Sequence, residues 1–149
     1  MSLSELPGVT TAPWVVLKFG GTSVSTRARW DTIGNLVSKR KSEGFRVLVV
    51  VSAVAGITNA LVALSETRGD RARRSSLVAE IIQRHRDFAR ALDLDADAVV
   101  GDLCQALTVL GEDPRAELAA LDWQAEVLSL GELFSSRLGS AYLTRQGVD

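Results

Sequence analysis

Residues 15–25 read VVLKFGGTSVS, and this stretch decides how the chain begins to fold. An apolar run typical of a β-strand leads into Lys18, and Gly20 and Gly21 follow almost at once. Three hydroxyl side chains come next, in TSVS. A lysine at the mouth of a strand, followed by two glycines, suggests a backbone shaped to lie against an anion. A double glycine is also common in an ordinary turn, so the rest of the chain must decide between these two interpretations.

The segments around this stretch predict a strand–helix–strand unit. Residues 14–19 read as a short buried strand, and Ser25 or Thr26 is placed to cap a helix that Gly44 ends. Residues 47–53 read VLVVVSA, a nearly continuous apolar run that is typical of a strand covered on both faces. Two strands joined by one helix at this spacing pair in parallel. The sequence therefore predicts an α/β fold with a parallel sheet.

The remainder of the chain is predicted to be helical. Apolar residues recur at helical spacing in four further segments, which are residues 55–66, 75–92, 97–110 and 115–138. Pro114 separates the last two of these segments. Two strands followed by four helices are an unusual inventory for a complete α/β domain.

Composition excludes several classes of function. The 149 residues are 46% hydrophobic and 23% charged, which is ordinary for one globular domain. The net charge of −1 gives no bulk attraction to nucleic acid or to anionic lipid, and no apolar run is long enough to span a membrane. We therefore expect neither nucleic acid nor a membrane as a partner. Residues 1–13 resemble a loose leader, and the arginine-rich run at 68–74 is interpreted as a solvated loop or helix start.

Two residues that invite a functional interpretation are predicted to be packing residues. Cys104 is the single cysteine, so it forms no internal disulfide, and a reducing cytoplasmic location fits this content. It has no lysine or arginine one helical turn away that would activate its thiol. His85 is the single histidine and lies on the apolar stripe of its helix, so we expect it at the edge of the core.

The last predicted helix carries an unexpected carboxylate. One line of residues along it is apolar, formed by Leu118, Leu121, Ala125 and Leu128. Glu132 continues this line inside a helix whose C-terminal half is apolar nearly all round and is therefore expected to be buried. A buried carboxylate is costly unless it meets a cation or several donors. A salt bridge to a neighbouring arginine and a ligand contact are both open interpretations. Gly131, which is unfavourable inside a helix, suggests the close approach of another backbone or a ligand.

A third group of candidate residues lies in SAVAGITN at 52–59. Ser52 ends the second strand, where open parallel sheets bind ligands, and Gly56 permits a tight turn. Thr58 lies in the first turn of the next helix, whose free amide groups favour an anion. Ser52 and Thr58 can equally be ordinary strand-end and helix-cap residues.

Together these segments resemble a known family. The segments KFGGTSV at 18–24, VVVSAVAGITN at 49–59 and LSLGELFSSRL at 128–138 are similar to three successive signatures of the aspartate kinases, within the amino-acid kinase superfamily. Their order and spacing match, and the resemblance extends from Trp14 almost to the end of the chain. The predicted nucleotide site is not a Walker-type site, because no GxxxxGK[ST] motif occurs in the sequence.

The resemblance implies a role for each candidate residue. Lys18 would be catalytic and would stabilise charge on the β- and γ-phosphates of ATP. The nucleotide site implied by the resemblance would consist of Lys18, Gly20, Gly21, Thr22 and Ser23. The aspartate pocket would be lined by Ser52, Thr58 and Glu132, with Glu132 holding the amino group. No protein residue is assigned to a metal.

The implied reaction is phosphoryl transfer from ATP to the β-carboxylate of L-aspartate, with Mg²⁺ as the metal cofactor. Its product is 4-phospho-L-aspartate, and the reaction is the first step of lysine, threonine and methionine biosynthesis. The implied fold is a three-layer α/β/α arrangement with a mainly parallel sheet. Residues 14–149 would form the N-terminal half of the kinase domain, in some relatives fused to a decarboxylase or a dehydrogenase. We expect these residues alone to be inactive and to form a homodimer through uncovered apolar sheet surface.

Two alternatives stay open at this stage. One is a kinase of the same superfamily with another acceptor, and the other is a non-catalytic binding or oligomerisation module.

Overall fold

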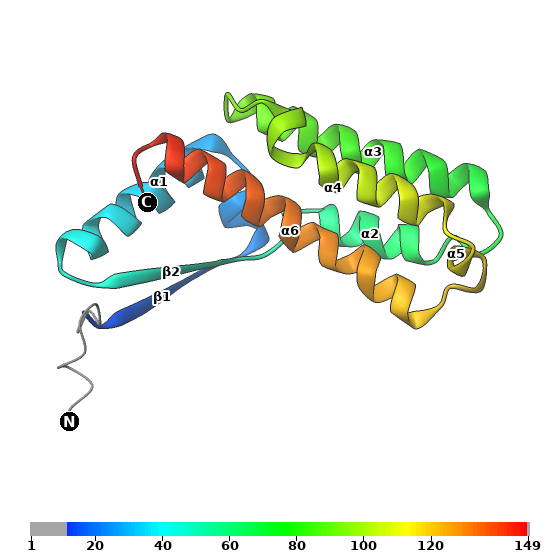
Figure 1. The fold of residues 1–149 in the computed structure, drawn as a ribbon, viewed down its shortest axis with the longest axis horizontal. Coiled ribbons are helices and arrows are strands. Elements are labelled where there is room, and N and C mark those ends of the chain that lie inside the picture. The colour runs from blue at the N-terminus through cyan, green and yellow to red at the C-terminus, as the bar shows by residue number, and fades with distance from the viewer. Residues whose placement is uncertain (1–11, 149) are drawn as a thin grey trace.

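The computed structural model describes residues 12–148 and contains one β-α-β unit joined to a group of helices (Figure 1). The strands are β1, Trp14–Phe19, and β2, Arg46–Val51. The helices are α1, Arg27–Ser42; α2, Ile57–Ser65; α3, Arg71–Ala91; α4, Ala96–Glu112; α5, Arg115–Leu118; and α6, Leu121–Arg145, and a short 3₁₀ turn, η2, spans Gly21–Val24. Most of the expected leader, residues 1–13, lies outside the described residues.

The two strands pair in parallel, as the sequence predicts. Lys18 lies opposite Val50 and Phe19 opposite Val51, so both strands end at the same edge of the sheet. Thr26 caps the intervening helix α1, because its side chain accepts a hydrogen bond from the amide of Arg29. The α/β class with a parallel sheet is therefore confirmed.

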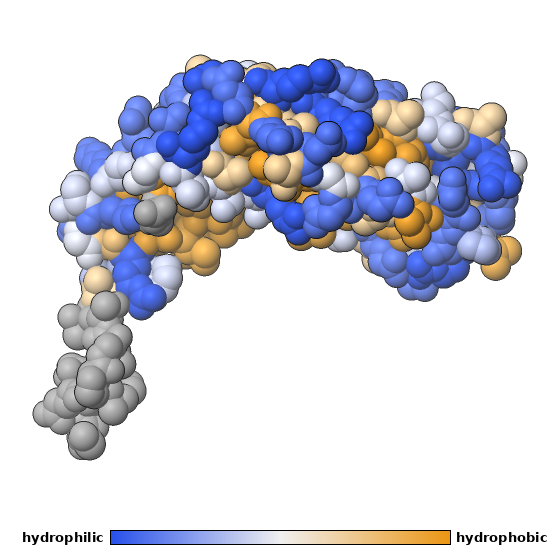
Figure 2. All heavy atoms as spheres, turned by 45° about the horizontal axis from the view of Figure 1, so that its top comes forward, coloured by the Kyte–Doolittle hydropathy of each residue, from blue (hydrophilic) through white to orange (hydrophobic). Residues whose placement is uncertain are grey.

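One face of the sheet is covered by helices and the other is open. Inward residues such as Val49 pack against the core, whereas four outward apolar residues are 40–58% exposed, namely Trp14, Val16, Leu48 and Val50. Figure 2 shows apolar surface in the part of the molecule that carries the sheet, while the outer faces of the helices are mainly hydrophilic. The uncovered apolar sheet surface expected of this chain is therefore present, whereas the second covering layer that the apolar run of β2 predicts is not formed by residues 12–148.

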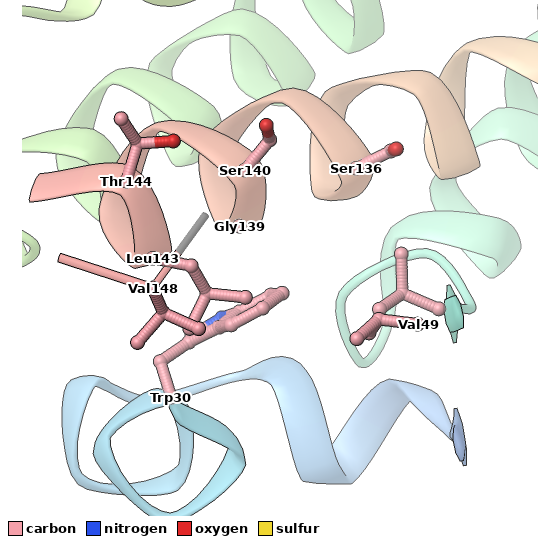
Figure 3. A pocket seen from close by; sticks show the side chains of 9 residues that line it. Trp30, Val49, Ser136, Gly139, Ser140, Leu143, Thr144 and Val148 are labelled. Atoms are coloured by element: carbon pink, nitrogen blue, oxygen red, sulfur yellow. The ribbon is translucent and has the colours of Figure 1, made fainter. Parts of the chain in front are cut away.

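Helix α6 joins the two parts of the molecule, running from the helical group to the sheet (Figure 1). It packs on α2 and α4 in one half and on α1 and β2 in the other. Near its end, the ring of Trp30 lies directly against Gly139, where a Cβ atom would come within 1.9 Å of the indole (Figure 3). This glycine therefore sets how closely α1 and α6 approach.

The predicted helix over 115–138 differs from the structure. Ala119 adopts the left-handed conformation with φ of +46°, which separates α5 from α6, and α6 continues to Arg145. Leu118 and Leu121, expected on a buried line, are 77% and 82% exposed. The buried side of α6 is the opposite one, formed by Trp123, Val127, Leu130, Phe134 and Leu138.

The helical group buries Arg74, a residue that the sequence predicts in a solvated basic run. Arg74 is 2% exposed; it donates to the carbonyls of Thr67 and Gly111 and pairs with Glu117. The rest of the basic run at 68–74 agrees with the prediction, because these residues form the turn before α3 and the first helical turn of α3. Burial of Arg74 depends on partners distant in sequence, which the basic run alone does not reveal.

His85 and Cys104 are both packing residues, in agreement with the sequence analysis. His85 is 1% exposed, stacks on Phe134 with ring centroids 4.0 Å apart, and bonds through Nδ1 to the Ile81 carbonyl at 2.8 Å. Burial lowers the pKa of His85 to about 4, so the ring is neutral at pH 7. Burial also raises the pKa of the Cys104 thiol, which makes it a poor nucleophile.

Candidate functional site

The candidate site lies where β1 and β2 end side by side. The amide of Ser52 donates to the Phe19 carbonyl at 3.1 Å and extends the strand pairing by one residue. Two loops leave from this edge: residues 20–26, which we call the glycine loop, and residues 52–56, which we call the β2–α2 loop. In parallel sheets this carboxyl edge is the usual place for a ligand.

Lys18 lies at the end of β1 on the open face of the sheet. Its side chain is exposed and has no ion-pair or hydrogen-bond partner within residues 12–148. An ammonium group without a carboxylate partner keeps its full charge for an anion. The position therefore suits the phosphate contact that the sequence analysis expects of Lys18.

The two glycines of the motif have different surroundings. A Cβ atom on Gly21 would lie 2.6 Å from the Ala53 carbonyl oxygen and 3.4 Å from the Ala55 amide, so only glycine allows this approach of the two loops. A Cβ atom on Gly20 would meet nothing within 4 Å. Gly21 is thus required by packing within the chain, whereas the open space at Gly20 leaves its backbone accessible to a ligand.

The hydroxyl residues of the motif lie on η2, directly after the glycines. Thr22 is exposed and Ser23 is half-buried. The Ser23 amide donates to the Gly20 carbonyl at 2.9 Å, which closes the turn. Neither side-chain hydroxyl forms a hydrogen bond to another described residue, so both remain available as donors to a ligand.

Ser52 and Thr58 flank the β2–α2 loop. Ser52 is half-buried at the end of β2, and Thr58 is exposed in the first turn of α2. Gly56 precedes α2 with φ of +80°, which confirms the predicted tight turn and makes Gly56, not Thr58, the residue at the helix cap. The Thr58 hydroxyl has no partner among the described residues, so helix capping does not explain it.

Glu132 is exposed on α6, and this corrects the expectation of a buried carboxylate. The side of α6 that carries Trp123 and Phe134 packs on the core, so Glu132 on the other side faces outward. Its Oε1 atom lies 3.5 Å from the Ala53 amide, at the limit of a hydrogen bond. Glu132 therefore needs no buried cation, and its charge is free to meet a ligand.

Gly131 explains how Glu132 reaches the β2–α2 loop. A Cβ atom on Gly131 would lie 2.9 Å from the Ala53 methyl group and 3.0 Å from the Leu61 side chain. A close approach at Gly131 is present as expected, but the approaching groups are side chains of this loop and of α2, not the backbone or ligand that was predicted. Ala53 is thus the meeting point of the three motifs, because Gly21 packs on its carbonyl and α6 on its methyl group.

Some predicted residues are not brought into contact. Lys18 lies on the open face of the sheet, whereas α6, which carries Glu132, covers the other face, and no interaction joins them within residues 12–148. A hollow of about 330 Å³ between α6 and β2, shown in Figure 3, is lined by residues such as Val49 and Ser140 and by no predicted site residue. Another, of about 380 Å³, lies beside Ser25 and His85 and also contains none of them.

Sequence reasoning missed the side chains that hold the two loops. Thr26 is the helix cap, whereas the Ser25 hydroxyl accepts from the Ala55 amide at 3.1 Å. Arg84 of α3 donates to the Ala55 carbonyl at 3.0 Å and to the Gly56 carbonyl at 3.5 Å. Their partners lie about 30 residues away in the chain, so no local pattern identifies either contact.

No group of three or more metal-ligating side chains occurs among the described residues, and no helix described here is long and apolar enough to cross a membrane.

Comparison with known proteins shows the same architecture in larger enzymes. The structure of E. coli aspartokinase III in complex with aspartate and ADP (R-state) superposes with a TM-score of 0.74 at 32% identity, covering 91% of this chain and 29% of that one. The structure of the same enzyme in complex with lysine and aspartate (T-state) gives a TM-score of 0.72 at 30% identity, covering 92% of this chain and 30% of that one.

Sequence relatives agree with these structures. The aspartokinase of Chlamydia muridarum is 32% identical over 86% of this chain and 27% of its own length. The bifunctional aspartokinase/homoserine dehydrogenase 1 of Arabidopsis thaliana is 32% identical over 91% of this chain and 16% of its own length. The chain thus spans less than a third of the relatives that it matches. Residues 13–149 match the amino acid kinase family, and the chain belongs to that family.

Proposed function

We propose that this chain supplies the N-terminal part of an aspartate kinase site, which transfers the γ-phosphoryl group of ATP to the β-carboxylate of L-aspartate. The observation that carries the proposal is the convergence at Ala53, where the glycine loop and the Glu132 segment meet at the end of the parallel strands. The aspartokinase relatives and the aspartate and ADP complexes of E. coli aspartokinase III support the choice of substrate and nucleotide.

In this proposal Lys18 provides charge for the transferring phosphoryl group. Its unpaired ammonium and the accessible backbone at Gly20 lie at the same strand end. Thr22 and Ser23 offer hydroxyl donors beside them. Phosphoryl transfer depends mainly on positioning and on neutralisation of charge, and these groups supply both.

Aspartate would be held from the other side of the strand ends. The Glu132 carboxylate, exposed beside the Ala53 amide, would accept hydrogen bonds from the substrate ammonium. Ser52 and the unpaired Thr58 hydroxyl would contact the substrate from the β2–α2 loop. One β-carboxylate oxygen attacks the γ-phosphorus, the bond to the β-phosphate oxygen breaks, and ADP leaves with the electron pair, so no proton is transferred.

Mg²⁺ would arrive with the ATP phosphates and neutralise their charge. The described residues offer no cluster of three ligating side chains, so we assign none of them to the ion and no step to it. A cytoplasmic location, in keeping with the single cysteine, is part of the same proposal.

Self-association is the second part of the proposal. The open face of the sheet carries Val16 opposite Leu48, and Trp14 stacks with the Arg46 guanidinium at 4.0 Å. An apolar sheet face of this kind is unfavourable in water and favours a second copy of the chain as its cover. Sedimentation of residues 1–149 alone tests this directly. We expect a dimer that dissociates when Val16 and Leu48 are changed to Lys, and a stable monomer of the unchanged chain would contradict the proposal.

The test of the reaction is an assay of the full-length gene product with ATP and candidate acceptors. The product on aspartate is an acyl phosphate, which hydroxylamine traps as a hydroxamate, so ADP and hydroxamate should both form only when aspartate is present. Formation of ADP with glutamate, acetylglutamate or uridylate instead would assign another kinase of the family. No ADP with any acceptor would favour a non-catalytic module.

A further inference from the structure

Ser25 lies at the point where the two loops of the site meet. Its hydroxyl donates to the Gly21 carbonyl at 2.5 Å and accepts from the Ala55 amide at 3.1 Å. A serine hydroxyl has one donor hydrogen and two lone pairs, so it can satisfy both contacts at once. Within residues 12–148 this is the one hydrogen-bonded connection between residues 20–26 and 53–56.

The far side of the β2–α2 loop is fixed independently. Arg84 of α3 holds the carbonyls of Ala55 and Gly56, so this loop is attached to the helical group. Within the described part of the chain, no hydrogen bond attaches the glycine loop to α3. Ser25 is therefore the group that transfers the fixed position of Ala55 to the backbone of Gly21.

The position of Gly21 matters because its neighbours leave little tolerance. A Cβ atom there would already lie 2.6 Å from the Ala53 carbonyl, so the two backbones are in close contact. Close contact without a hydrogen bond limits how near the loops can come, but it does not prevent them from separating. The bridge through Ser25 supplies the attraction that opposes separation.

We propose that Ser25 is a positioning residue, which holds the glycine loop against the β2–α2 loop so that Lys18 and Glu132 act on one substrate pair. The inference rests on the proposed kinase function, and Ser25 itself touches neither substrate. A displacement of about 1 Å at such a site can lower the rate by about two orders of magnitude, so loss of the bridge has its effect on kcat.

The experiment compares three variants of the full-length gene product. Ser25→Ala removes the hydroxyl, and Ser25→Thr keeps it, with room for the extra methyl group because Ser25 borders the hollow of about 380 Å³. Ser42→Ala is the matched control, since the Ser42 hydroxyl also donates to a backbone carbonyl, that of Lys39 at 2.7 Å, at the opposite end of α1.

Two measurements are made on each variant. Hydrogen exchange at the Ala55 amide should become at least about tenfold faster in Ser25→Ala and stay unchanged in the other two, because only that variant removes its acceptor. The kcat of Ser25→Ala should be about tenfold or more below that of wild type, with KM for ATP and for aspartate changed less than about twofold. The kcat of Ser25→Thr should stay close to that of wild type, because its hydroxyl is kept.

The outcomes separate this inference from the proposed function. Unchanged exchange at Ala55 would show that the bridge is absent, and faster exchange with unchanged kcat would show that the bridge does not position the site. A Ser25→Ala variant that fails to fold would make the role structural and overturn the inference. A wild-type protein without kinase activity would overturn the proposed function and the positioning role of Ser25 together, while the exchange data would still report whether the loops are joined.

Discussion

A single methyl group added at Gly21 tests the packing on which the site depends. In Gly21→Ala the new Cβ atom would lie 2.6 Å from the Ala53 carbonyl oxygen, about 0.8 Å closer than an ordinary contact. Ala53 cannot retreat, because it is 4% exposed and its own methyl group already packs on Gly131. The glycine loop must therefore move outward, away from the strand ends.

The expected cost follows from the kind of clash. Forcing an extra methyl group into a packed site typically costs 1–3 kcal/mol, and we expect about 2 kcal/mol of unfolding free energy to be lost in Gly21→Ala. The kcat for aspartate phosphorylation should fall by up to about 10²-fold, since the phosphate-contacting backbone shifts by a large fraction of 1 Å.

Gly20→Ala is the matched control for stability. Its Cβ atom would meet nothing within 4 Å, and its backbone, with φ of −77° and ψ of 170°, suits alanine. We expect its unfolding free energy to stay within about 1 kcal/mol of wild type. Chemical denaturation of the full-length gene product and its two variants gives the comparison. Equal stability of Gly20→Ala and Gly21→Ala would refute the close contact with Ala53.

Three further predictions concern other parts of the molecule. Glu132→Gln should raise KM for aspartate by roughly tenfold or more and leave KM for ATP nearly unchanged, because a charge-assisted contact is worth about 1.5–3 kcal/mol; an equal rise in both would assign Glu132 a structural role. Gly139→Ala should lower the free energy of unfolding, measured by denaturation, by about 3 kcal/mol or more, because its Cβ atom would lie 1.9 Å from the Trp30 ring. Gly101→Ala is the control: the nearest atom to its Cβ would be 3.9 Å away, so this variant should be as stable as wild type or more stable. His85 makes the fold acid-sensitive, because its pKa is about 4 in the folded chain and 6.5 in the unfolded chain, so the unfolded chain binds more protons between these pH values. The free energy of unfolding should therefore fall by about 2 kcal/mol from pH 7 to pH 5. A His85→Gln variant with the same pH dependence would contradict this prediction.

The two strands and their parallel pairing could be predicted from sequence because their signals are local. The apolar run before Gly20 and Gly21 predicts the end of β1 at Phe19, and one connecting helix makes the pair parallel. The end of β2 was predicted two residues too late, at residue 53 instead of Val51, because no glycine follows that strand until Gly56. Gly131 could likewise be identified, because glycine inside a helix is unfavourable and calls for a packing reason.

The exposure of Glu132 could not be predicted, because both sides of the segment 121–138 are apolar and the pattern does not show which side packs on the other helices. In the structure the side of Trp123 and Phe134 is buried, so Glu132 on the other side faces outward. The break at Ala119 could not be predicted either, since this position is neither glycine nor proline. Arg74 and Ser25 were misjudged for a related reason. Each has a hydrogen-bond partner 30 or more residues away, Gly111 for Arg74 and Ala55 for Ser25, so local composition suggested a solvated run and a helix cap.

The central claim is that Lys18 supplies the positive charge for phosphoryl transfer to aspartate, and the kcat of Lys18→Ala in the full-length gene product measures it most directly. Formation of aspartyl hydroxamate from ATP and aspartate should be readily measured with the wild-type protein and should fall by at least about 10²-fold in this variant, as for loss of one preorganised charge contact. The unpaired, exposed position of Lys18 predicts unchanged stability, so the loss will not reflect unfolding. A folded Lys18→Ala protein with near wild-type kcat would contradict the account.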